Sequence, residues 1–219
     1  MKIFIVSFIC SLCVFVNQHC VSQDINYKAG YYITLQGDTI KGFILVKGKN
    51  ILNDVNFKNS KSDKNVNLVS LDSCNAISIG KSKYINWYGR RSMTYVTKFD
   101  FQIKNVDSFL TQRIPLKLIY SGKYLTLYHY YDIMDHFFVG YKNDIQELSI
   151  SYRYLSSWER LKYTINPPSY FITPGYRYQL IAMLKDKIPK KLTYHIESCE
   201  FEAITLTRLF RKLDKSIRE

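Results

Sequence analysis

A tyrosine-rich segment, YSGKYLTLYHYYD at residues 120–132, constrains the fold of this chain more than any other feature. Ser121-Gly122-Lys123 separates two runs rich in aromatic and apolar residues, 114–120 and 124–131, and this arrangement is typical of a β-hairpin. In the second run leucines alternate with tyrosines, so the two kinds of side chain lie on opposite sides of the strand. Tyrosine suits a half-buried strand, because its ring packs while its hydroxyl stays at water. We therefore expect half-buried strands that carry many of the 19 tyrosines.

The same pattern of apolar runs and turn residues extends over most of the region 23–165. Gln36-Gly37-Asp38 and Lys142-Asn143-Asp144 each separate two β-rich runs, which predicts two further hairpins. The polar segment 58–65 (KNSKSDKN) is expected to be an exposed loop. The remaining predicted strands are 31–35, 39–45, 55–57, 66–71, 76–79, 84–88, 93–101, 137–141 and 145–152.

The hydrophobic period becomes helical after Pro167-Pro168. Thr173 followed by Pro174 is typical of a helix N-terminus, and apolar residues then recur at helical spacing as far as Pro189. A second helix is predicted to begin at Ser198, an N-cap residue, and to carry one apolar stripe. The end of the chain is therefore expected to contain two helices.

The predicted fold class is α+β. An antiparallel β-rich region built of hairpins, either barrel-like or strongly curved, precedes the two C-terminal helices. We expect a single domain over residues 23–219, with the β-rich part at 23–165 and the helical part at 166–219. A chain of 219 residues that is 47% hydrophobic can bury a real core, which excludes disorder throughout.

The N-terminus has the pattern of a secretory signal peptide over residues 1–22. One lysine precedes the uncharged apolar run Ile3–Val16, and Cys20-Val21-Ser22 places small residues before a cleavage site after Ser22. The run is too short for a membrane span, which needs roughly 20 apolar residues. The expected location is the periplasm or cell envelope. A lipoprotein anchored at Cys20 is the alternative, although the three residues before it make a poor lipobox.

Removal of residues 1–22 leaves two cysteines, Cys74 and Cys199. In an exported protein they can form one disulfide. The other interpretation is two buried free thiols, which pack as small apolar side chains. Both alternatives stay open, and the absence of a CxxC or Cys/His spacing predicts no structural metal site.

The segment Gly30–Ile44, GYYITLQGDTIKGFI, resembles the opening hairpin of uncharacterised exported proteins that are common in Bacteroidetes. The order of the later features is also similar, with the tyrosine hairpin, the segment 137–148 and a terminal helical region that contains Cys199. The resemblance covers most of the mature chain loosely. It implies export and this architecture, and it brings no activity with it.

The densest group of polar residues is His129, Asp132, Asp135 and His136, which could in principle bind a divalent metal. Alternation places His129 with the leucines of its strand, however, and the two aspartates lie in an expected turn. The sequence contains no G-x-S-x-G, P-loop or G-x-G-x-x-G motif. We therefore predict no catalytic residue, no metal and no cofactor.

The formal net charge of +13 favours an anionic partner. Basic and aromatic residues interleave in one stretch, and such interleaving can bind a polyanion such as lipopolysaccharide or anionic lipid headgroups. The simpler interpretation is a solvated lysine-rich surface, because the charge is spread along the chain. Export argues against nucleic acid. The candidate ligand-binding residues are Lys83, Tyr84, Trp87, Tyr88, Arg90 and Arg91.

These observations predict a non-enzymatic envelope protein with a binding or structural role, whose partner is an anionic envelope component or another envelope protein. The alternative is a secreted hydrolase whose site is not visible in one sequence. After cleavage of the signal peptide, no transmembrane span is expected.

Overall fold

The structure is a computed structural model that describes residues 27–45, 54–93, 95–96, 103–104, 109–162 and 170–217. The predicted signal peptide at 1–22 lies outside the described residues, and so does most of the predicted strand 93–101. Within the described ranges, no helix is long and apolar enough to cross a membrane.

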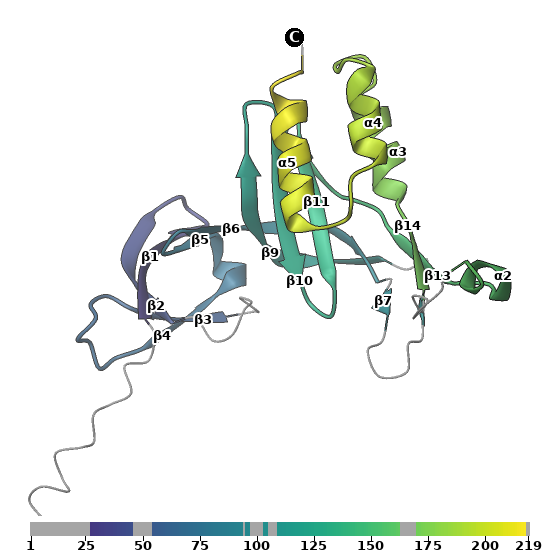
Figure 1. Cartoon of the computed structure of the whole chain (residues 1–219). Coiled ribbons are helices and arrows are strands. Elements are labelled where there is room, and N and C mark those ends of the chain that lie inside the picture. The colour runs from purple at the N-terminus through teal and green to yellow at the C-terminus, as the bar shows by residue number, and fades with distance from the viewer. Residues whose placement is uncertain are drawn as a thin grey trace, which may run out of the picture.

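In this part of the chain, ten strands form one sheet in which neighbouring strands are antiparallel (Figure 1). The strand order is β12-β11-β10-β9-β6-β5-β1-β2-β3-β4, and β13–β14 and β7–β8 form two small separate sheets. The bounds are β1 Tyr27–Thr34, β2 Thr39–Leu45, β3 Asp54–Lys58, β4 Asn67–Ser70, β5 Cys74–Ile79, β6 Ser82–Ser92, β7 Tyr95–Val96, β8 Ile103–Lys104, β9 Phe109–Ser121, β10 Leu125–Tyr131, β11 Asp135–Tyr141, β12 Asp144–Glu147, β13 Ser151–Tyr154 and β14 Tyr170–Thr173.

The sheet has two halves, β1–β5 and β9–β12 (Figure 1). The long strand β6 lies between them and pairs with β5 on one side and with the long strand β9 on the other. The first half curves around its own core, in which Ile44, Phe57 and Ile77 are almost fully buried. The ring of Tyr32 packs edge-on against Phe57 at 5.1 Å, so strands that are not neighbours meet in this core. This half therefore covers its apolar face mainly by bending.

The second half is covered by helices on one face (Figure 1). Leu125 and Leu127 of β10 face the helices and pack in one core with Leu206 and Phe210 of the last helix. The opposite face holds a smaller core that includes Phe138. The predicted alternation of leucine and tyrosine along β10 is thus confirmed. The helices that follow β14 are α3 Gly175–Leu184, α4 Lys191–Glu197 and α5 Ala203–Asp214; the short α2, Ser157–Arg160, follows β13.

The predicted α+β class and the predicted hairpins are confirmed, except that the predicted strand 145–152 is divided: β12 ends at Glu147, and Ser151–Tyr154 form β13 in another sheet. The sheet is curved rather than closed, because its outer strands are β12 and β4. The number of C-terminal helices is three instead of two in the described residues. Ser198 is the C-cap of α4 and not an N-cap, since its hydroxyl donates back to the carbonyl of Tyr194 at 2.9 Å. The last helix begins at Ala203, after Glu202.

The two cysteines of the described chain are free thiols rather than a disulfide. Cys74 is fully buried in the core of the first half, whereas Cys199 lies in the helix-covered core of the second. Burial raises the pKa of both thiols. They therefore pack as small apolar side chains, which is the second of the two interpretations of the sequence.

Candidate functional site

The turn between β9 and β10 is held by the carboxylate of Asp214, in the last turn of α5. This carboxylate accepts hydrogen bonds from the backbone N–H groups of Lys123 at 2.9 Å, Tyr124 at 2.8 Å and Leu125 at 2.7 Å. Burial alone would raise the pKa of Asp214, but these backbone donors lower it. A Cβ atom at Gly122 would lie 2.3 Å from the carboxylate carbon, so only glycine fits. The end of α5 therefore fixes the shape of this turn.

The turn between β11 and β12 lies at the same end of the sheet, because β9 to β12 are consecutive antiparallel strands. Lys142 and Asn143 both have positive φ, 49° and 66°, which is the conformation of a tight two-residue hairpin turn. The ammonium of Lys142 lies 5.3 Å from the centre of the Tyr141 ring, and that of Lys123 lies 4.6 Å from the Tyr124 ring. Each turn thus presents a lysine next to a tyrosine ring.

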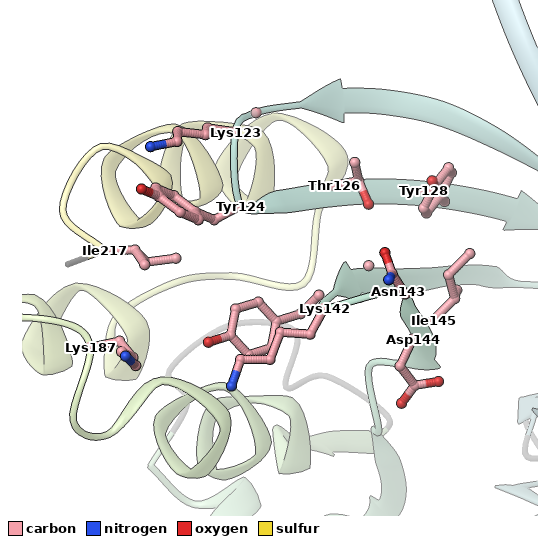
Figure 2. Close-up of a pocket in the computed structure, with 13 residues that line it drawn as sticks. Lys123, Tyr124, Thr126, Tyr128, Lys142, Asn143, Asp144, Ile145, Lys187 and Ile217 are labelled. Atoms are coloured by element: carbon pink, nitrogen blue, oxygen red, sulfur yellow. The ribbon is translucent and has the colours of Figure 1, made fainter. Parts of the chain in front are cut away.

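A pocket of about 540 Å³ opens between these two turns (Figure 2). Lys187, which follows α3, and Ile217, which follows α5, complete its wall from the helical side. Figure 2 shows Lys123 on one side of the space, with Lys142 and Lys187 on the other. We call this the lysine–tyrosine pocket. Its lining residues are Gly122, Lys123, Tyr124, Thr126, Tyr128, Gly140, Tyr141, Lys142, Asn143, Asp144, Ile145, Lys187 and Ile217.

The floor of the pocket comes from paired strands β10 and β11. Thr126 lies directly opposite Gly140, and a Cβ atom at Gly140 would lie 2.0 Å from the Thr126 hydroxyl oxygen. The missing side chain therefore makes room for the threonine, next to Tyr128. The lining residues include three lysines and one carboxylate, that of Asp144, so the lining carries a net positive charge.

The six predicted ligand-binding residues all lie on β6, and the structure does not bring them together. Alternation along a strand sends successive side chains to opposite faces. Trp87 packs edge-on against Phe138 at 5.1 Å, and Arg91 is buried, whereas Tyr84 packs against the core of the first half. The three that are exposed are Lys83, Tyr88 and Arg90.

Two of these exposed residues, Tyr88 and Arg90, belong to a strip across β6 and β9. The guanidinium of Arg90 lies 3.8 Å from the centre of the Phe109 ring, and that of Arg113 lies 5.9 Å from the Tyr88 ring. The strip is basic and aromatic. These four side chains do not line the pocket of about 540 Å³ described above.

A charged cluster connects β6, β11, β12 and the turn before β11. Arg91 pairs with Asp132 at 2.7 Å, and the ring of His136 lies between Asp132 at 3.2 Å and Glu147 at 2.6 Å. The second carboxylate oxygen of Glu147 accepts the backbone N–H of Ser92. The cluster therefore ties the end of β6 to β12, although three strands separate them in the sheet order.

The electrostatics of this cluster indicate a structural role. Burial alone would lower the pKa of His136, but its two carboxylate partners raise it to about 9. His136 also holds the pKa of Asp132 well below its usual range, although burial opposes this effect. Both ring nitrogens of His136 are engaged, and the cavity beside it measures only about 10 Å³. The cluster leaves neither a free base nor space for a substrate.

His129 and Asp135, the other half of the predicted polar group, form a separate pair at 2.6 Å. His129 lies on the strand face of Leu127, and His136 pairs with Tyr130 on the other face. In the described ranges, no three His, Cys, Asp or Glu side chains are grouped so as to hold a metal ion.

Comparison with protein-family models, curated proteins and solved structures finds no match for this chain. The chemistry of the lysine–tyrosine pocket is therefore the basis for a functional proposal.

Proposed function

We propose that this chain is a non-enzymatic exported protein that binds an anionic component of the cell envelope in the lysine–tyrosine pocket. One observation carries the proposal. Lys123, Lys142 and Lys187 come from three separate segments and line the same open pocket of about 540 Å³. Like charges brought together in this way repel, and a bound anion would relieve that repulsion.

The pocket matches a ligand that combines negative charge with a polar or ring-shaped body. Lysine ammonium groups bind phosphate and carboxylate as point charges. Tyr124, Tyr128 and Thr126 add ring surface and hydroxyl groups to the same lining. The net charge of +13 on the whole chain would raise the local concentration of anions and speed their encounter with the pocket.

The location of this activity rests on the N-terminal sequence. The apolar run Ile3–Val16 and the small residues before position 23 have the pattern of a signal peptide, and the resemblance of the Gly30–Ile44 hairpin implies the same location. N-terminal sequencing of the chain from the periplasmic fraction tests this part. Recovery of the chain only from the cytoplasm, with residues 1–22 attached, would remove the envelope from the proposal.

The alternative of a secreted hydrolase gains no support from the described residues. The only histidine with two carboxylate partners among them is His136, and it is buried and fully engaged. If His136→Ala or Asp135→Ala abolished turnover of an envelope substrate while the chain stayed folded, the hydrolase would replace the binding proposal.

Retention on immobilised heparin, a polyanionic probe, tests the pocket. The variant Lys123→Ala/Lys142→Ala/Lys187→Ala removes three charges from the pocket. The matched control removes three exposed lysines from the first half of the sheet and changes the net charge by the same amount. The control substitutions are Lys61→Ala, Lys64→Ala and Lys81→Ala.

We expect the pocket variant to leave heparin at clearly lower salt than the control, and its affinity for a heparin oligosaccharide to fall by about tenfold or more. The control should stay close to the native chain. Elution of both variants at the same salt would assign retention to diffuse surface charge and would overturn the proposal.

A further inference from the structure

A short turn after β13 exposes large apolar side chains. Within the described residues, Trp158 of α2 is the most exposed large hydrophobic side chain, at 81%, and Leu161 nearby is 74% exposed. Both lie in the segment 154–162, which we call the Trp158 turn and which also exposes Tyr154. A soluble surface tolerates single exposed apolar residues, but a group of them marks a site of interaction.

Local contacts support the exposed conformation of the Trp158 turn. Ser156 and Glu159 form a capping box at the start of α2. The Glu159 carboxylate also receives two hydrogen bonds from Arg153, at 2.7 and 2.5 Å, and the Arg153 guanidinium lies 4.8 Å from the Phe171 ring of β14. These contacts join α2, which carries Trp158, to the β13–β14 sheet.

The charge of the Trp158 turn is positive. Glu159 is its only acidic residue, and Arg153 pairs with it. Arg160 and Lys162 stand on either side of Leu161, and both are exposed. Basic groups therefore flank the exposed apolar side chains within one turn of the chain.

We propose that the Trp158 turn contacts the surface of an anionic lipid bilayer, with Trp158 and Leu161 in the headgroup region and Arg160 and Lys162 facing lipid phosphates. Tryptophan favours the membrane–water interface, and nearby basic residues add electrostatic attraction to anionic lipids. A second copy of the chain is a poor partner for this surface, because two copies that each carry a net charge of +13 repel one another. A protein partner needs about 800 Å² on each side, which is large for a four-residue helix and its flanks.

Tryptophan fluorescence can test this site directly, because the chain has only two tryptophans, Trp87 and Trp158. The variant Trp87→Phe leaves Trp158 as the only reporter, and circular dichroism checks that the variant is folded. Vesicles of phosphatidylcholine alone are compared with vesicles that also contain phosphatidylglycerol. The N-terminal segment contains no tryptophan and is common to all variants, so differences between the variants do not come from it.

We expect the anionic vesicles to shift the Trp158 emission to shorter wavelength and brominated lipids to quench it, whereas neutral vesicles have little effect. High salt should reduce the shift. In co-sedimentation, Trp158→Ala/Leu161→Ala should lower the bound fraction several-fold. The matched control, Tyr178→Ala/Tyr194→Ala, removes two aromatic residues that are 77% and 71% exposed on α3 and α4, and should bind as the native chain does.

An unchanged Trp158 emission in anionic vesicles would overturn this proposal, even if the chain sedimented with them. Equal sedimentation of the Trp158 and Tyr178 double variants would do the same. The Trp158 emission separates this site from the lysine–tyrosine pocket, because no tryptophan lines the pocket and the pocket is tested with a soluble polyanion. Loss of heparin binding in the pocket variant, with the Trp158 shift retained, would leave both proposals standing.

Discussion

The two halves of the sheet cover their apolar faces in different ways. In the β1–β5 half, Phe57 and Ile44 are buried between bent strands and a single 3₁₀ turn at Leu71–Ser73. In the β9–β12 half, the cover is a set of helices, and Phe210 of α5 is fully buried against the sheet. The lysine–tyrosine pocket lies in the second half, where helix ends meet strand turns. The comparison teaches that helices added to a sheet supply side chains to its turns as well as cover for its core.

The largest expected effects come from the two cores. Phe57→Ala and Phe210→Ala each remove a side chain that is at most 1% exposed, so each should lower the free energy of unfolding by about 3–5 kcal/mol. Because β6 and β9 join the halves in one sheet, both variants should still unfold in one transition. Urea unfolding followed by fluorescence and circular dichroism measures this. Two separate transitions would show that the halves are independent units.

The His136 cluster is the next test, because it ties β6 to β12 within the curve of the sheet. The pKa of His136 is raised from its ordinary value of 6.5 to about 9. Its contribution is therefore fully present below pH 6.5 and is lost as the pH rises through about 9. The expected loss is about 3 kcal/mol.

Urea unfolding of the native chain and of His136→Gln over this pH range measures that loss. Glutamine does not titrate, so the stability difference between the two chains should shrink as the pH rises. Other titrating groups are common to both chains and cancel in the difference. A difference that stays constant from about pH 6.5 to 9 would contradict a protonated His136 in the folded chain.

Asp214→Asn should have a smaller effect, because asparagine keeps one acceptor oxygen for the turn between β9 and β10. We expect a loss of about 2 kcal/mol, since the three backbone donors lose a charged acceptor. The folded-state pKa of Asp214 is lowered, so its contribution is present above the ordinary range of aspartate and is lost as the pH falls.

A carboxylate in a turn of the first half provides the comparison for Asp214. Asp63 accepts the backbone N–H of Ser60 at 2.8 Å, so its carboxylate bonds within its own loop rather than joining a helix to a turn. Asp63→Asn should therefore change the urea midpoint much less than Asp214→Asn. Equal midpoints for the two variants would show that docking of α5 does not hold its turn.

The sequence predicts local features of this fold well. The tyrosine hairpin follows from Ser121-Gly122-Lys123 and from the alternation beside it, and both signals lie within a few residues. The hydrogen bond from the Tyr124 N–H to Asp214 joins residues that are 90 positions apart in the sequence, and no local sequence pattern predicts it. The short helix α4 lies between Pro189 and α5 and is too short to give a clear helical period.

The site was less predictable than the fold. The interleaved residues of β6 look like one group in the sequence, but strand alternation divides them between two faces, as Tyr88 and Arg91 illustrate. The pairs Lys123-Tyr124 and Tyr141-Lys142 carry a usable signal. They occupy alternate turns of consecutive antiparallel strands, which must lie at the same end of a sheet. The contribution of Lys187 depends on how the helices dock, and the sequence does not reveal it.

An NMR titration of the ¹⁵N-labelled chain with a sulfated disaccharide tests the central claim most directly, because it locates the anion. We expect the largest amide shifts in the two turns that carry Lys123 and Lys142, with further shifts near Lys187. The basic strip around Arg90 and Arg113 should shift less, because its side chains do not line the pocket. Shifts centred on that strip, or spread evenly over the surface lysines, would contradict anion binding in the lysine–tyrosine pocket.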